Sequence, residues 1–411
     1  MEVVHERCAG LDVHKATVVA CVLTSKRRET RTFGTMTDDL QQLLSWLQEE
    51  GVSHAVMEST GIYWRPVYNV LEDQGIELLV VNARHVKAVP GRKTDVKDAE
   101  WLGDLLRHGL VRASFIPSRW QRELRDLVRY RRTLIQELAR HTTRMQKVLE
   151  SANIKLSDVA SDVLGRSGRA MLTEIAAGHD NPEELAALAL SNPRKKTDQL
   201  KRALRGSVGP AQRFTIASLL RVVEELEDEL DTVDHEVEKR MRPYGAAIDL
   251  LDEIPGIAPH GAEQILAETG IDMSRFPTHA HFVSWAKVCP GNRQSGGKQR
   301  SASTGPGNEW LRSALVEAVL GSVQASRRHP NFFAARYKRL AGRRGNKRAA
   351  MAVAHSMLVA IYYMLRDGTH YEELGGNHWD EHHREDVVRR STQRLEQLGY
   401  SVTLAGATTV T

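Results

Sequence analysis

The first 118 residues alternate short apolar stretches with longer amphipathic ones, and this alternation restricts the possible folds more than any other feature. Cys8–Leu23 is rich in Val and Ala and predicts a strand or a hairpin, while His54–Met57 and Ile76–Val81 predict short strands. The expected helices are Met36–Glu50, Pro66–Gln74, which Gly75 ends, and Asp95–Leu106, with Thr94 as its N-cap. Strands that alternate with helices predict an α/β region, a sheet with helices packed on it.

A second region, residues 119–242, carries the signature of two long helices. Apolar residues from Trp120 to Val148 follow steps of three and four, interrupted once at Arg131, and Ile216–Val237 follows the same steps without a gap. Such heptad spacing is typical of a coiled-coil arm. The pattern leaves three arrangements open: an antiparallel arm, a dimer contact, or a bundle within one chain.

The composition changes again near Pro243, where helical patterns, glycine-rich turns and many basic residues begin. We expect an α/β domain over 1–118, a helical arm over 119–242, a mainly helical C-terminal domain over 243–367 and a polar tail over 368–411. The tail contains His378, His382 and His383, which indicate either a metal site or a solvated segment.

Charged residues are unevenly distributed, although the whole chain carries a net charge of only +5. Residues 119–147 contain nine Lys or Arg against three Asp or Glu, and residues 318–366 contain ten Lys or Arg and no acidic residue. Residues 224–238, in contrast, contain nine acidic residues. Each Lys or Arg that contacts a phosphate releases a condensed counterion. The segregation therefore favours nucleic-acid binding over a generic basic surface.

The three cysteines, Cys8, Cys21 and Cys289, form no C-x-x-C pair, which argues against a disulfide framework and against a thiolate zinc site. A reducing cytoplasm is therefore the expected compartment. The N-terminus shows no apolar segment of a secretory signal, and the longest apolar stretch, Met351–Leu365, is shorter than the roughly 20 residues that span a bilayer. We expect no membrane partner.

Four carboxylates stand at the strands and helices of the α/β region. Asp12 lies within the first apolar strand, and Glu58 ends the second. Asp95 and Asp98 are three residues apart on a predicted helix and so share one of its faces. A strand aspartate can also be a turn or capping residue, and a D-x-x-D pair can be a polar helix face. If the helix packs on the strands, however, the four would converge and need cations, and oxygen ligands suit two Mg²⁺ or Mn²⁺ ions.

Leu251–Gly270 predicts a helix, a Pro-Gly turn and a second helix, the form of a helix-hairpin-helix element. The backbone N–H groups of such a turn, here at Gly256, hold a DNA phosphate without reading bases. An ordinary corner between two helices is the alternative interpretation.

A glycine-rich loop, Pro290–Arg300, contains Ser295 among basic residues. Glycines let a backbone approach a ligand closely, so the residues alone favour a phosphate-binding or flexible loop over a nucleophilic serine. Ser301 and Ser303 follow closely. The residues that we expect to contact nucleic acid are Lys93, Lys97, Gly256, Arg293, Gly296, Gly297, Lys298, Arg300, Arg343, Arg344, Lys347 and Arg348.

Several short motifs lie near the two ends of the chain. They are Gly10–Lys15, Met57–Gly61, Asn82–Lys87, Lys93–Ala99, Ile254–Ile257, Arg275–Phe276 and Gln294–Gly297. In this order they resemble the insertion-sequence transposases of the IS one-ten family. The resemblance extends over residues 8–117 and 250–365.

The resemblance implies an RNase H-like (RuvC-like) N-terminal domain with Asp12, Glu58, Asp95 and Asp98 as metal-binding catalytic carboxylates. It implies a C-terminal transposase domain in which Ser295 is the nucleophile, a phosphoserine bond to DNA and strand exchange by transesterification. It further implies a structured non-coding guide RNA that pairs with donor and target DNA, a homodimer or homotetramer, and a bacterial cytoplasmic protein that joins the nucleoid when active.

Three other functions fit parts of the pattern. A metal-dependent nuclease or junction resolvase would hydrolyse DNA without a serine ester. A non-catalytic nucleic-acid-binding protein would use the hairpin element and the basic helices alone. An actin-like sugar kinase or ATPase shares an early strand aspartate, but a second phosphate-binding signature is missing.

Overall fold

The computed structural model describes residues 2–59, 61–82, 98–189, 194–290, 294–295, 298–299, 304–305 and 307–404. The chain forms two compact units, Met1–Trp120 and Gln121–Thr411.

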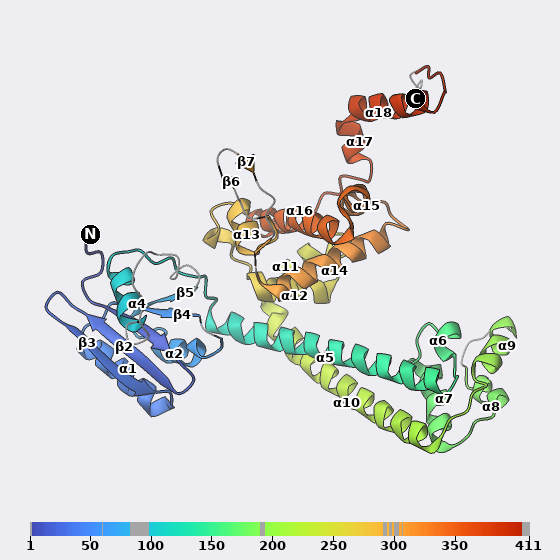
Figure 1. Cartoon of the computed structure of the whole chain (residues 1–411), viewed down its shortest axis with the longest axis horizontal. Helices are drawn as coiled ribbons and strands as arrows, with labels where there is room; N and C mark the ends of the chain where they lie inside the picture. Colours follow the sequence, from blue (N-terminus) through green and yellow to red (C-terminus); the bar gives the residue numbers. More distant parts are fainter. Residues whose placement is uncertain are drawn as a thin grey trace. The chain divides into compact units, whose positions relative to one another are not determined.

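The first unit is built on a five-stranded sheet in the order β3-β2-β1-β4-β5 (Figure 1). The strands are β1 (Cys8–Val13), β2 (Thr17–Leu23), β3 (Arg28–Gly34), β4 (His54–Glu58) and β5 (Glu77–Val81). β2 is antiparallel to β1 and β3, whereas β1, β4 and β5 are parallel. The predicted mixed α/β region is therefore confirmed, and of the two alternatives for Cys8–Leu23, a strand or a hairpin, the structure shows the hairpin.

Helices cover both faces of this sheet. α1 (Thr37–Glu49) and α2 (Trp64–Leu71) pack with the side chains of Ala9, Leu11 and Val13 on one face. α4 (Asp98–Arg107) packs on the other face, against Cys8 and its neighbours on β2 and β4. Alternate residues of each strand therefore point toward different helices.

The strand β3 was not expected from the sequence. Its residues, Arg28–Gly34, are mostly exposed, and they lack the alternation of apolar and polar side chains that marks a half-buried strand. β3 is an edge strand, and it pairs with β2 over seven residues, from Thr17 with Gly34 to Leu23 with Arg28. Its backbone pairing, not burial of its side chains, places it in the sheet.

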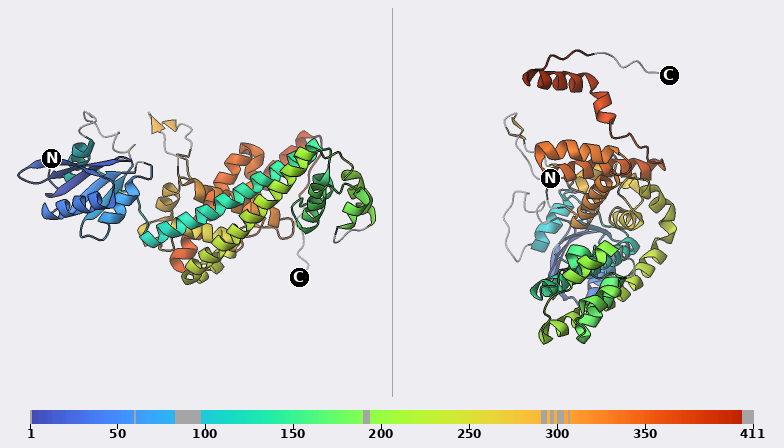
Figure 2. Two further views of the ribbon diagram at one scale, coloured as in Figure 1. Left: turned by 90° about the horizontal axis from the view of Figure 1, so that it is seen from below. Right: turned by 90° about the vertical axis from the view of Figure 1, so that its right-hand side faces the viewer.

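Two long antiparallel helices, α5 (Arg119–Ser151) and α10 (Pro210–Met241), begin the second unit and run side by side (Figure 2). Ser151 near the end of α5 accepts a hydrogen bond from Gln212 near the start of α10. Toward the other end, the Tyr130 hydroxyl donates to Glu229. The expected pair of long helices is confirmed within one chain, and a coiled coil remains a prediction.

Four shorter helices connect the far ends of this pair. They are α6 (Leu156–Val159), α7 (Arg166–Ala177), α8 (Pro182–Ala187) and α9 (Arg194–Ala203). Their apolar faces share one core with the last turns of α5, at Met145 and Leu149, and with the first turns of α10, at Ile216 and Leu219. This core fixes the distal end of the arm.

The rest of the second unit is mainly helical. Its elements are η2 (Arg242–Tyr244), α11 (Gly245–Asp252), α12 (Pro259–Thr269), η3 (Met273–Arg275), α13 (His279–Trp285), β6 (Gln294–Ser295), β7 (Lys298–Gln299), α14 (Glu309–Ala325), α15 (Phe332–Arg344), α16 (Asn346–Asp367), α17 (His378–His382) and α18 (Arg384–Gln397). α12 is buried at every residue from Ala262 to Thr269, because it packs against both α11 and α14.

Among the described residues, α16 alone is long and apolar enough to cross a bilayer by length and composition. It extends beyond the apolar stretch expected from the sequence, over 22 residues. Half of its most apolar window is buried inside the protein, and it packs against α13, α14 and α15.

Candidate active site

Asp12 and Glu58 lie at the same edge of the sheet. Parallel pairing joins Leu11 of β1 to Met57 of β4, so the next residue of each strand is a carboxylate. Ala9, Leu11 and Met57 belong to the core under α1 and α2. Because side chains alternate along a strand, Asp12 and Glu58 share the opposite face, the one that α4 covers.

The start of α4 lies toward the same edge. The Cys8 thiol donates a hydrogen bond to the Gly103 carbonyl, and a Cβ on Gly10 would overlap the backbone of Ala99 and Gly103. Moving along β1 from Cys8 to Asp12 therefore leads toward the first turn of α4. Asp98 begins this helix, and its Oδ1 atom is buried. A glycine at position 10 lets the helix approach the strand closely.

Asp12 also has a local partner. Its Oδ2 atom is hydrogen-bonded to His14 Nε2 at 3.1 Å, and its side chain is 20% exposed. The contact orients the carboxylate at the edge of the sheet and leaves part of it accessible. Glu58 is partly buried at the same edge.

Within the described part of the chain, no group of three or more His, Cys, Asp or Glu side chains is arranged to hold a metal ion. Asp95, Lys93 and Lys97, which complete the predicted site, lie outside the described residues. Asp12 and Glu58 at this edge, and Asp98 at the start of α4, all offer oxygen ligands. Oxygen ligands fit Mg²⁺ or Mn²⁺ and do not suit a soft metal.

Ser295 lies in the second unit, on a short hairpin. β6 and β7 are antiparallel, and Ser295 pairs with Lys298 through the backbone. Arg293, Gly296, Gly297 and Arg300 lie outside the described residues, as do the alternative nucleophiles Ser301 and Ser303. The predicted phosphate contacts of this loop remain predictions.

The predicted helix-turn-helix is present as α11, a turn and α12. Gly256 in the turn has φ +96°. A Cβ at this position would overlap the Ala318 carbonyl oxygen and the Ser322 amide nitrogen, both on α14. Close packing of the turn on α14 therefore accounts for the glycine, and a helix-hairpin-helix role remains a prediction.

The predicted basic surface at the end of α15 and the start of α16 is exposed at Arg343, Arg344, Lys347 and Arg348. Within the part of the chain that the structure describes, these four side chains form no ion pair with an acidic residue. One turn earlier on α15, burial lowers the pKa of Arg339, and the neighbouring charge of Arg336 lowers it further. Cations thus crowd this surface.

The arginines of α5 have a different environment, which the sequence did not reveal. Arg131 donates to Glu263 of α12 at 2.6 Å, and both side chains are at least 90% buried. Arg129 forms a bidentate pair with Glu268 at 2.7 and 2.8 Å. Arg132 donates to Glu317 of α14 at 2.8 Å. These cations join helices of the protein and are not available to phosphates.

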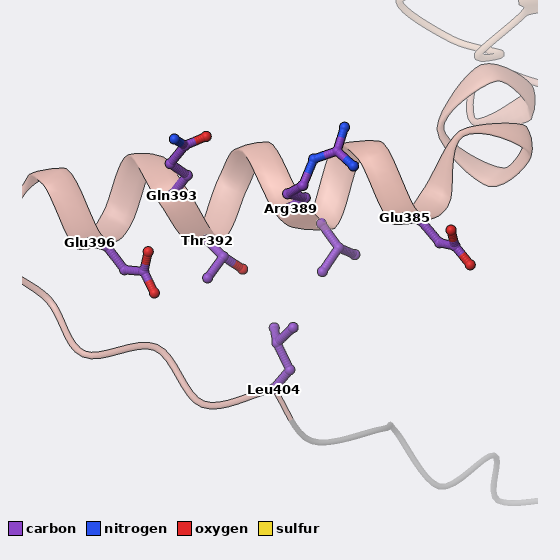
Figure 3. A pocket seen from close by; sticks show the side chains of 7 residues that line it. Glu385, Arg389, Thr392, Gln393, Glu396 and Leu404 are labelled. Atoms are coloured by element: carbon purple, nitrogen blue, oxygen red, sulfur yellow. The ribbon is translucent and has the colours of Figure 1, made fainter.

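Three pockets lined by described residues of the second unit lie apart from the predicted site residues. The pocket in Figure 3, about 620 Å³, lies between α18 and the segment at Leu404, with Glu385, Arg389 and Thr392 in its wall. A second, about 320 Å³, is lined by α5 and α12 with Glu317, and a third, about 300 Å³, by α15, α16 and residues 369–374.

The tail histidines form ring contacts. His378 and His382 have ring centroids 4.2 Å apart, and His383 stacks on Trp379 at 4.4 Å. They belong to no group of three potential ligands in the described residues. The indole of Trp379 in turn lies against Arg339 of α15, 4.2 Å from its guanidinium carbon.

Comparison with known families places the chain among transposases. A family model described as "Transposase" matches residues 9–154, and one described as "Transposase IS116/IS110/IS902 family" matches residues 248–337. The first match covers the carboxylate edge and the second covers α12 and the Ser295 hairpin. The chain belongs to the IS110 family of transposases.

Curated relatives have related names. A putative transposase of Sinorhizobium fredii, y4pF/y4sB, is 29% identical over 37% of this chain and 39% of its own length. The IS110 43.6 kDa protein of Streptomyces coelicolor is 28% identical over 30% of each chain. The IS900 42 kDa protein of Mycobacterium paratuberculosis is 26% identical over 72% of this chain and 80% of its own. The chain thus matches less than half the length of the first two.

Proposed function

We propose that this protein is a DNA transposase that cuts and exchanges strands with carboxylates on an RNase H-like domain. The observation that carries the proposal is the meeting of Asp12 and Glu58 at one edge of the sheet, toward the start of α4 and Asp98, in a chain of a transposase family. The strand order, with β2 antiparallel to both neighbours and β1, β4 and β5 parallel, supports the RNase H-like fold.

Asp12, Glu58, Asp95 and Asp98 would hold two Mg²⁺ or Mn²⁺ ions. Such ions, when bound, polarise a phosphodiester and neutralise the charge that its oxygens develop. The protein itself orients the ligands. His14 is hydrogen-bonded to Asp12, and the close contact of α4 with Gly10 fixes how near the start of α4, with Asp98, lies to the sheet.

Ser295 would act as the nucleophile. Its Oγ forms a bond to phosphorus while the bond to one DNA oxygen breaks, and the serine proton passes, in net, to the departing DNA hydroxyl. The product is a protein–DNA ester, and attack by another DNA hydroxyl reverses the step and rejoins strands. Lys298, Arg293 and Arg300 adjoin the serine in sequence and would stabilise the phosphate charge.

The remaining parts of the proposal rest on family membership. A structured non-coding RNA would pair with donor and target DNA, so that the protein itself needs to bind only backbone and shape. Lys93, Lys97, Gly256, Gly296 and Gly297 would contribute phosphate contacts near the two sites. The protein would act in the bacterial cytoplasm, at the nucleoid, as a homodimer or homotetramer.

The carboxylate site is tested by Asp12→Asn in cells that carry the gene with its flanking DNA. We expect loss of excised and rejoined products in a junction-specific amplification, with nucleic-acid binding retained. The matched control is Asp73→Asn, the same change at an exposed turn with φ +63°, a conformation that asparagine adopts readily. Strand exchange by Asp12→Asn at the normal level would reject the site.

The serine chemistry is tested by trapping. A denaturation-resistant protein–DNA adduct that maps to Ser295 by mass spectrometry, and that Ser295→Ala abolishes, is the expected result. Separate Ser301→Ala and Ser303→Ala variants show whether a neighbouring serine reacts. Metal-dependent cleavage that survives in Ser295→Ala without any adduct would favour a hydrolytic nuclease or junction resolvase instead.

A further inference from the structure

Glu268 of α12 is a charged side chain that the proposed reaction does not use, and it is 1% exposed. Arg129 of α5 binds both its oxygens, and Arg125 Nε lies 3.5 Å from Oε2. The Asn308 side chain donates to the same Oε2 atom at 2.5 Å. A buried carboxylate needs such compensation. Its partners come from α5 and from the residue that precedes α14.

The Asn308 side chain both caps α14 and binds Glu268. Its Oδ1 atom accepts hydrogen bonds from the backbone N–H groups of Trp310 and Leu311, which caps α14. Its Nδ2 group donates to Glu268. Asn308 is also where the segment that carries Ser295 joins α14. Glu268 therefore holds the end of that segment through one hydrogen bond.

The two ends of the segment meet at this point. A Cβ on Gly307 would lie 2.6 Å from Lys287 Cβ and 3.0 Å from the Ala286 carbonyl oxygen, so Gly307 lies directly against the end of α13. Lys287 leaves that helix with φ +55°. The Arg312 guanidinium reaches back to the Thr304 hydroxyl at 3.5 Å. Gly307 and Lys287, which stand on either side of the segment that carries Ser295, therefore lie against each other at its base.

We propose that Glu268, acting through Asn308, is a positioning residue that fixes the base of the Ser295 loop and so sets where the serine hydroxyl lies. This inference rests on the proposed role of Ser295 as nucleophile. A small displacement of a reacting group slows a reaction steeply while substrate binding at other contacts is retained. The effect of breaking the Glu268–Asn308 contact should therefore fall on the rate of ester formation.

The test uses Asn308→Asp in the full-length chain. Aspartate keeps the size and the capping oxygen but turns the donor that faces Glu268 into an acceptor. Asn181→Asp is the matched control, because Asn181 also caps a helix with its oxygen and donates to a glutamate, Glu184, at 2.7 Å. We expect adduct formation on the order of tenfold slower in Asn308→Asp only, with DNA affinity unchanged.

Two further measurements separate positioning from loss of structure. The double variant Glu268→Gln/Asn308→Asp restores a donor–acceptor pair with reversed polarity, and it should recover part of the rate. Proteolysis between Cys289 and Asn308 should be faster in Asn308→Asp than in the wild type or in Asn181→Asp.

Each outcome is decisive. Wild-type adduct rates and wild-type proteolysis in Asn308→Asp would overturn the inference, as would a rate loss that follows the melting temperature equally in both single variants. If the wild type forms no adduct at Ser295 but Asn308→Asp is still cleaved faster than the wild type, the serine mechanism is rejected. The role of the Glu268–Asn308 contact in fixing the base of the loop is then retained.

Discussion

Two arginine-rich helical regions of the second unit, α5 and α15–α16, look alike in the sequence and differ in the structure. On α5, the hydrogen bond that Arg132 donates to the Glu317 carboxylate raises the pKa of Arg132. On α15, burial and the charge of Arg336 lower the pKa of Arg339. Among the described residues, the Nε atom of Arg336 is buried without a hydrogen-bond partner.

The difference teaches that the number of basic residues does not identify a phosphate-binding surface. Arg129, Arg131 and Arg132 of α5 are neutralised by glutamates of α12 and α14, so these three stabilise the fold. The α15–α16 cations repel one another and gain stability when an anion arrives. We therefore propose that the α15–α16 surface binds nucleic acid, whereas Arg129, Arg131 and Arg132 of α5 serve in structural pairs.

The largest expected effect comes from breaking a buried pair on α5. Arg131→Ala leaves Glu263 buried beside His260 without its main cation, and this should lower the free energy of unfolding by about 3–5 kcal/mol. Denaturant titration measures the loss. Arg343→Ala, at an exposed position, should change stability by less than about 0.5 kcal/mol. Equal effects of the two variants would remove the distinction between the regions.

The second effect concerns binding. We replace Arg343, Arg344, Lys347 and Arg348 together by Gln. The slope of the logarithm of the DNA association constant against the logarithm of salt concentration should become less negative by about 3–4, because four phosphate contacts are lost. Fluorescence anisotropy across a salt series measures this slope.

The control for this variant removes the same charge elsewhere. Arg27, Arg31, Arg213 and Arg240 each lie within 4.0 Å of a carboxylate. Replacing these four by Gln should leave the salt slope nearly unchanged. If both quadruple variants weaken binding equally, net charge and not the α15–α16 surface governs affinity.

The third effect is a dependence of stability on pH. Burial lowers the pKa of His355 of α16, with further lowering by Arg336 of α15 and His279 of α13. The unfolded chain therefore binds the proton more readily than the folded one, and stability should fall as the pH drops below about 6.5. Comparison of thermal unfolding at neutral and mildly acidic pH should show a smaller drop in His355→Gln. An identical drop in both proteins would contradict this assignment.

The smallest effect should come from the outer pair of α5. Glu317 is 58% exposed, so Glu317→Gln should cost less than about 1 kcal/mol. Chemical denaturation of this variant beside Arg131→Ala shows whether depth of burial controls the strength of the pairs. A loss as large as that of Arg131→Ala would show that the whole set acts as one network.

Local patterns predicted the parts of the fold that depend on local sequence. A strand or hairpin over Cys8–Leu23, the strand that ends at Glu58 and the two long helices all follow from periodicity. The apposition of Asp12 and Glu58 depends on the parallel pairing of β1 with β4, which the local patterns did not specify. β3 could not be found, because an exposed edge strand needs no apolar alternation.

The pairing of α5 with α12 could not be predicted from the sequence either, although one residue of α5 indicated that a buried partner exists. Arg131 interrupts the heptad steps of α5, and a charged residue at such a position indicates a buried partner. The partner, Glu263, is 132 residues away in the sequence, and no local rule selects it. The same holds for Glu268 and Asn308, which meet only because α12 packs on α14.

The continuous helix α5 sets the spacing between two contact regions, the ion pairs with α12 and α14 and the distal core. Arg129, Arg131 and Arg132 pair with α12 and α14, and Met145, thirteen residues after Arg132, lies in the distal core. One residue inserted between these two regions would rotate one region relative to the other by about 100° and shift it by about 1.5 Å along the helix axis. Either the ion pairs or the distal core would then face away from its partner. This spacing should tolerate changes of side chain far better than changes of length.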